Sequence, residues 1–71
     1  MVMENSLDNL ILDEMRRHTY NVTYAIANGI HMTTGYRYRS SAILRRLRAL
    51  EAVGYVRCLG FRGNMYEWAL A

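Results

Sequence analysis

The segment Ser41–Val56, SAILRRLRALEAVGYV, contains the clearest structural pattern in this chain. Within it Ile43, Leu47 and Leu50 recur at helical spacing, which places three branched aliphatic side chains on one face of a helix. The residues of the opposite face are small or cationic, namely Ser41, Arg45, Arg48 and Ala52. We therefore expect a helix that packs against the core through its aliphatic face and presents arginine on the other.

Both ends of this helix carry recognisable signals. We expect Ser40 or Ser41 to cap its N-terminus, because a serine hydroxyl accepts a hydrogen bond from a backbone N–H that has no partner inside the helix. Gly54 follows the last apolar turn and suits the left-handed residue that commonly ends a helix. The sequence thus predicts a third helix that ends just before Gly54.

The residues after Gly54 predict a β-hairpin. Two segments rich in aromatic and β-branched residues, YVRCL (55–59) and MYEWAL (65–70), flank the glycine-bearing turn GFRGN (60–64). The residues expected to close over the helices are Val56, Tyr66, Trp68 and Leu70. We interpret Trp68 as a core residue, because a small domain needs large apolar side chains.

Two further helices are predicted upstream. The segment from Ser6 to His18 is amphipathic, with Leu7, Leu10, Ile11 and Met15 on one face. A short β-capable segment, Thr19 to Asn21, follows it, and Asn21 is expected to cap a second helix that runs to about Thr33 and ends at Gly35. Tyr36 to Arg39 is predicted to be an extended connector with both arginines on one side. The order of elements indicates an α+β fold, mainly helical.

Length and composition restrict the class of protein. With 71 residues the chain is expected to be one domain, residues 1–71, with a thin stability margin that dimerisation would increase. The single cysteine, Cys58, has no disulfide partner, and together with the distant His18 and His31 it does not make a zinc site. No apolar run approaches the roughly 20 residues that span a bilayer. We expect a cytoplasmic protein without metal or cofactor.

The charge is distributed unevenly. Residues 1–36 carry two arginines against four acidic residues, a net −2, whereas residues 37–71 carry seven arginines against two acidic residues, a net +5. Every basic residue is arginine, whose planar guanidinium suits phosphates and guanine edges. A cationic half of this kind provides a face for a polyanion. No pairing of nucleophile and base and no phosphate loop is recognisable, so no enzymatic activity is expected.

The order of elements, together with LRALEAVGYV at the end of the third helix, resembles the winged helix-turn-helix domain of bacterial and archaeal transcription regulators. The segments YAIANGIHMTTGYRYR and SSAILRRLRALEAVGYV look most like the PadR-type regulators, and the Leu-Glu-x-x-Gly ending is shared with MarR-like and ArsR-like domains. The resemblance implies a transcriptional regulator that binds double-stranded DNA as a homodimer. PadR-type proteins continue past the wing, whereas this sequence ends at Ala71, so a dimer is expected to use the first helix or the wing.

The resemblance also implies which residues contact DNA. The third helix would enter the major groove, with Arg45 reading bases and Arg48 reading bases or contacting phosphate. The full set of expected DNA-binding residues is Arg37, Arg39, Ser40, Ser41, Arg45, Arg48 and Arg62. Arg62, between glycines at the wing tip, suits the minor groove or is simply part of an exposed turn. Arg46 departs from the family pattern and is expected to pair with Asp13 or Glu14, or to extend out of the core edge.

An alternative function is a protein-interaction module, such as an accessory protein that a phage or plasmid uses to act on host machinery. In that case Leu44, on the flank of the third helix, and Phe61, on the wing, would form an apolar contact patch with a protein partner. Retention of a partner without nucleic acid would favour this function over DNA binding.

Overall fold

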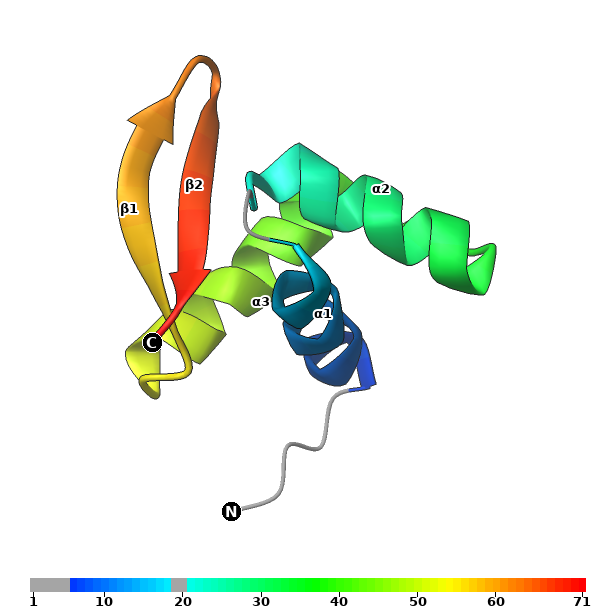
Figure 1. Cartoon of the computed structure of the whole chain (residues 1–71), viewed down its shortest axis with the longest axis horizontal. Coiled ribbons are helices and arrows are strands. Elements are labelled where there is room, and N and C mark those ends of the chain that lie inside the picture. Colours follow the sequence, from blue (N-terminus) through cyan, green and yellow to red (C-terminus); the bar gives the residue numbers. More distant parts are fainter. Residues whose placement is uncertain (1–5, 19–20) are drawn as a thin grey trace.

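The computed structural model describes residues 6–18 and 21–71. Three helices precede an antiparallel two-stranded hairpin: α1 (Ser6–Arg17), α2 (Thr23–Thr34), α3 (Ser40–Ala52), β1 (Val56–Arg62) and β2 (Met65–Leu70). The helices pack against one another, and the hairpin stands beside α3 with its tip projecting past the helices (Figure 1). This arrangement matches the mainly helical α+β, winged-helix-like layout that the sequence predicts.

The link between α1 and α2 differs from the expectation in its capping. The residue before α2 is Val22, which makes no side-chain cap, while the Asn21 amide donates to the His18 carbonyl at 3.0 Å. The prediction that Asn21 caps α2 is therefore wrong, because its side chain satisfies a carbonyl at the end of α1 instead.

In the described part of this link Val22 forms an isolated β-bridge with Glu67, supported by the Trp68 N–H, which donates to the Asn21 carbonyl at 2.8 Å. The remainder of the expected segment, residues 19–20, lies outside the described residues. This contact ties the start of α2 to the hairpin.

Helix α3 begins and ends differently. Its N-cap residue is Arg39, and no side chain caps it, so the prediction of a serine cap is wrong: Ser40 is already the first helical residue. At the other end Gly54 has φ 88°, and the Tyr55 N–H donates to the Leu50 carbonyl at 2.9 Å. This left-handed ending confirms the prediction for Gly54. Gly35 ends α2 in the same way.

The turn of the hairpin is shorter than predicted. Residues 60–62 belong to β1, and Arg62 pairs with Met65, which leaves only Gly63 and Asn64 in the turn. Gly60 is at a β-bulge, where the register shifts between Cys58 and Gly60, and its φ is 129°. A glycine at a bulge and a glycine in a turn give the same sequence signal, which explains the error.

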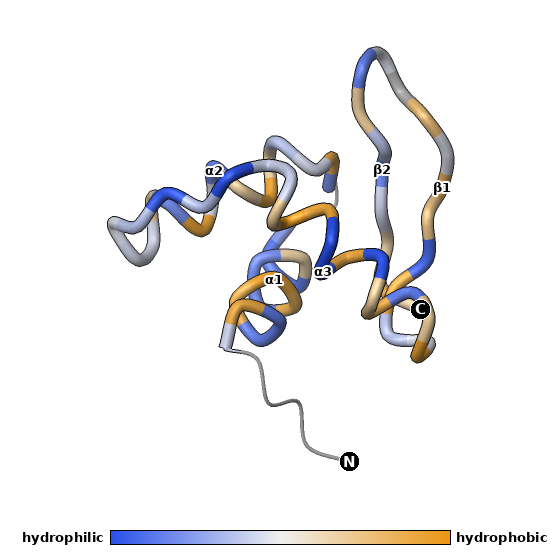
Figure 2. Tube along the Cα trace, turned by 180° about the vertical axis from the view of Figure 1, so that it is seen from behind, coloured by the Kyte–Doolittle hydropathy of each residue, from blue (hydrophilic) through white to orange (hydrophobic). Residues whose placement is uncertain are grey.

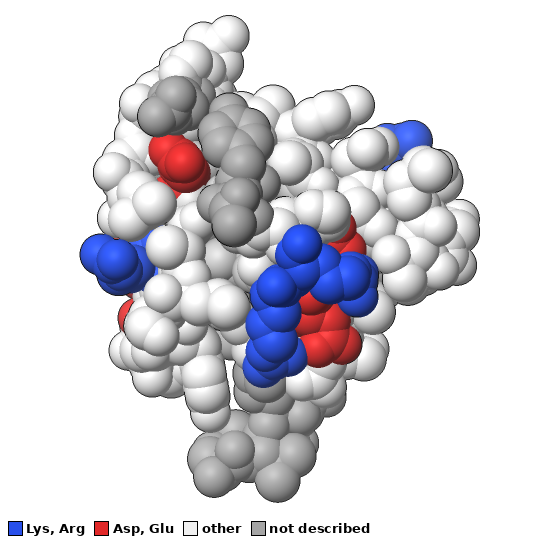
Figure 3. All heavy atoms as spheres, viewed as in Figure 1, with Lys and Arg blue, Asp and Glu red and all other residues white. Residues whose placement is uncertain are grey.

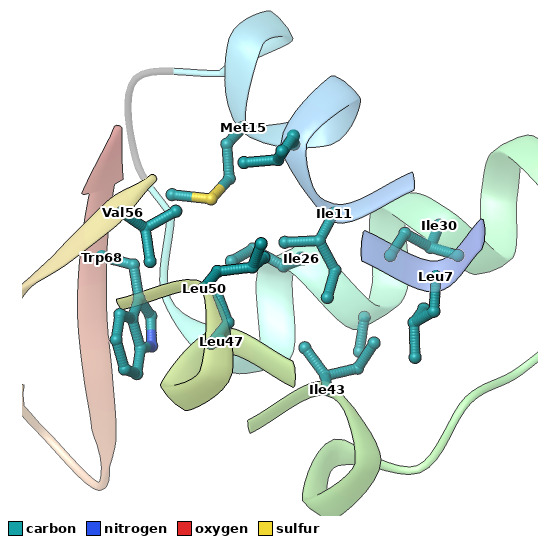
Figure 4. Close-up of a cluster of buried hydrophobic side chains, with 12 residues drawn as sticks. Leu7, Ile11, Met15, Ile26, Ile30, Ile43, Leu47, Leu50, Val56 and Trp68 are labelled. Atoms are coloured by element: carbon teal, nitrogen blue, oxygen red, sulfur yellow. The ribbon is translucent and has the colours of Figure 1, made fainter. Parts of the chain in front are cut away.

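The core forms where the three helices and the hairpin meet (Figure 4). Trp68 extends from β2 toward α3, is 1% exposed, and donates its indole N–H to the Thr23 hydroxyl at 3.1 Å. Val56 is buried beside it and Tyr66 is partly buried, but Leu70 at the end of β2 is 38% exposed. The prediction that Leu70 faces the core is therefore wrong, whereas the central position of Trp68 is confirmed.

Candidate nucleic-acid interface

The connector between α2 and α3 presents arginine to solvent. Arg37 and Arg39 are both exposed, and the backbone carbonyl of Arg39 accepts hydrogen bonds from the first turn of α3. Tyr38, between them, is partly buried against the core, and its ring meets that of Tyr36 edge-on at 4.7 Å. Anchoring through Tyr38 fixes the backbone from which the two guanidinium groups extend.

The start of α3 continues this exposed surface. Ser40 and Ser41 are exposed, and Arg45 follows one turn later on the face away from the buried Ile43, Leu47 and Leu50. Within residues 6–18 and 21–71, the side chains of Arg37, Arg39 and Arg45 make no hydrogen bond or ion pair. These three guanidinium groups are therefore available to an external anion.

The side chain of Arg48 extends from α3 over the hairpin. Its guanidinium carbon is 4.7 Å from the centre of the Tyr66 ring and 5.3 Å from that of Trp68, and Nη1 donates to Glu51 at 3.2 Å. A cation over aromatic faces is attracted by their quadrupole. Arg48 is thus engaged within the protein, so it is less available for base reading than Arg45.

Arg46 lies on the flank of α3 that packs against α1, away from the hairpin. Its guanidinium pairs with Asp8 of α1. The prediction that Arg46 pairs with Asp13 or Glu14 is therefore wrong, whereas the structural role expected for Arg46 is confirmed. The hydrogen bond to Asp8 raises the pKa of Arg46 above its ordinary value, against an opposing effect of desolvation. The reason for the error is geometric: Asp13 and Glu14 are committed to Arg16 and Arg17 along α1.

Positive charge on α1 is neutralised locally. Arg16 pairs with Asp13 at 2.7 Å, and Arg17 donates to Glu14. In the centre of the face shown in Figure 3, arginine and acidic spheres lie directly against one another. Arginines without a partner among the described residues lie instead on the connector and on the outer face of α3. Figure 2 shows that hydrophilic and hydrophobic residues alternate along α3.

The hairpin adds further cations. Arg62 is the last residue of β1, directly before the turn, and its side chain lies outside the described atoms. Arg57, earlier in β1, is exposed and has no ion pair within the described part of the chain. Arg57 is absent from the set of DNA-binding residues expected from the sequence. The alternation of side chains along the strand already indicated that Arg57, next to the buried Val56, faces solvent.

The described residues bring together no group of three His, Cys, Asp or Glu side chains that could hold a metal ion, and none of their helices has the length and apolar character needed to cross a membrane. No family model matches the chain, and no curated protein or solved structure is detectably similar to it.

Proposed function

We propose that this chain binds double-stranded DNA and acts as a small transcriptional regulator of the winged-helix type, similar to PadR-type regulators. In this proposal α3 enters the major groove, and the hairpin lies on the minor groove or the backbone. The protein would work in the cytoplasm as a homodimer that reads an inverted repeat.

The observation that carries the proposal is the separation of paired from unpaired arginines. On α1 the cations are neutralised by Asp13 and Glu14, whereas Arg37, Arg39 and Arg45 have no partner in the described structure. A cation without an internal partner can release counterions from DNA on binding. Its guanidinium can also donate two hydrogen bonds to a guanine edge.

Four arginines of the connector and α3 have distinct roles in the proposal. Arg45 is the base-reading residue, because it lies on the exposed face of α3 near its N-terminal half. Arg37 and Arg39, with Ser40 and Ser41, contact the phosphates that fix the register of α3. Arg48 supports the hairpin and contributes little to base reading.

The test is selection of a cognate site from a randomised duplex library, followed by fluorescence anisotropy at two salt concentrations. We expect Arg39→Ala to weaken all sequences similarly and to lower the salt slope by about 1, whereas Arg45→Ala costs about 1–3 kcal/mol and relaxes specificity at one base pair. Arg16→Ala is the matched control, since that arginine is already paired with Asp13. A folded chain that binds no duplex, or binds without salt dependence, would disprove the proposal.

A further inference from the structure

An apolar groove lies where the hairpin tip approaches the starts of α2 and α3. It has a volume of about 260 Å³. Its lining residues are Thr23, Tyr24, Ser40, Ser41, Leu44, Phe61, Asn64, Met65 and Tyr66. None of these side chains is charged, and hydroxyl groups with one amide supply the polar atoms. The groove therefore suits an apolar group with room for a few hydrogen bonds.

The backbone of β1 places Phe61 in this groove. After the bulge Phe61 is directly opposite Tyr66, and their rings meet edge-on at 4.9 Å. Tyr66 shares its face of β2 with the buried Trp68, so without the extra residue Phe61 would point to the other face of the hairpin. Gly60, with φ 129°, makes the bulge possible. Phe61 nevertheless remains 61% exposed, so the bulge gives it little burial.

Exposed arginines lie next to the uncharged groove. Arg39 immediately precedes Ser40, and Arg45 immediately follows Leu44; both are exposed and lack a partner among the described residues. On the inner side Arg48 covers the Tyr66 ring, whose other ring neighbours are Phe61 and Trp68. An occupant with complementary charge is therefore apolar at its centre and anionic at its edges.

We propose that this groove binds an acidic segment of a partner protein, anchored by one bulky apolar side chain. A segment fits better than a small molecule because the walls are open: Tyr24 is 51% and Phe61 61% exposed, whereas a small-molecule site usually encloses most of its ligand. The anchor fills the space beside Leu44, its neighbours cover the exposed aromatic rings, and the carboxylates of the segment reach Arg39 and Arg45.

The position of the groove gives this segment a regulatory effect. Ser40, Ser41 and the adjacent arginines belong to the surface assigned above to DNA, so segment and duplex exclude each other. Only this competition rests on the proposed function. Binding of the segment to the groove does not depend on it.

The experiment uses a synthetic peptide of twelve residues with Leu and Phe at helical spacing between Asp and Glu, titrated into the isotopically labelled full chain. We expect shifts at Tyr24, Leu44 and Met65, and binding that a peptide of equal charge with alanine anchors loses. Phe61→Ser should weaken binding about tenfold. Leu59→Ser is the matched control: Leu59 is 50% exposed on the same strand but does not line the groove, so its loss should change affinity by less than about twofold.

The proposal would be overturned by no binding of the peptide, by equal binding of the alanine-anchored peptide, or by equal loss in the two serine variants. Shifts produced by indole but not by the peptide would identify a small-molecule pocket and also overturn it. A second titration with a duplex separates the two proposals. Simultaneous binding of peptide and duplex removes the competition alone, whereas peptide binding without any duplex binding removes the proposed function alone.

Discussion

Both carboxylate oxygens of Asp8 accept hydrogen bonds from Arg46, at 2.8 Å from Nε and 2.9 Å from Nη2. Asp8 is only 4% exposed and the Arg46 side chain is 31% exposed, so the pair links the first turn of α1 to the middle of α3 at the edge of the core. A bidentate arginine–carboxylate pair fixes orientation as well as distance. Together with the shared hydrophobic core, this pair holds α3 against α1 and leaves Arg45 on the outer face of α3.

The first prediction concerns this pair. Asp8→Ala should lower the midpoint of urea unfolding clearly, because it leaves the Arg46 guanidinium without its partner at the edge of the core. Asp13→Ala is the control, since the Asp13–Arg16 pair is more than half exposed at both ends and should contribute about 0–1 kcal/mol. Equal midpoints for the two variants would contradict a structural role for Asp8.

The second prediction concerns Gly29 in α2. A Cβ at this position would collide with the Glu14 carboxylate, which is buried and held by Arg17 and His18. Gly29→Ala should therefore destabilise the protein by about 1–3 kcal/mol, although alanine favours helix.

In a Glu14→Ala background the obstruction is absent. There the same Gly29 substitution should stabilise by about 0.5–1 kcal/mol through helix propensity. Urea titrations of the four proteins in this double-mutant cycle would check the change of sign. Additive effects would show that the glycine is not required by the carboxylate.

The third prediction concerns the hydrogen bond from Trp68 to Thr23. Thr23→Val keeps the shape of the side chain but removes the acceptor of the buried indole N–H, so it should cost about 1–2 kcal/mol. Trp68→Ala removes the largest core residue and should cost about 3–5 kcal/mol, which is comparable with the whole stability of a chain this short. Circular dichroism should show that the tryptophan variant is largely unfolded while the valine variant is folded.

The fourth prediction concerns Arg48. Arg48→Met retains a flexible apolar stem but removes the cation above Tyr66 and Trp68. We therefore expect the free energy of unfolding to fall by about 0.5–1 kcal/mol and amide exchange in β2 to become faster. Its effect on the salt slope of DNA binding should be smaller than that of Arg45→Ala. An equal decrease in slope would assign Arg48 to phosphate contact instead.

The helices and most of the core follow from local sequence patterns. The spacing of Ile43, Leu47 and Leu50 predicts a buried face, and these residues are at most 2% exposed. The left-handed Gly54 at the end of α3 follows equally well. Capping was less predictable: an asparagine or serine near a helix start has several backbone partners within reach, and Asn21 bonds to the preceding helix.

The candidate interface is only partly encoded in such patterns. A helical wheel shows that Arg46 and Arg48 lie off the buried face of α3. It does not show that α1 covers the flank that carries Arg46 and that the hairpin covers the flank that carries Arg48. The bulge at Gly60 is similarly hidden, since the sequence GFRGN is typical of a turn. Once the bulge shifts the register, Phe61 joins Tyr66 at the groove.

The sequence by itself determined the order of elements, the buried face of each helix, the central tryptophan and the concentration of arginine in the second half. Those features depend on residues within a few turns or a few strand positions of one another. Only the tertiary structure decided which arginines are engaged, with Asp8 holding Arg46 and the hairpin holding Arg48. Such pairs join residues up to tens of positions apart, and their geometry depends on how whole elements pack rather than on the spacing within any one of them.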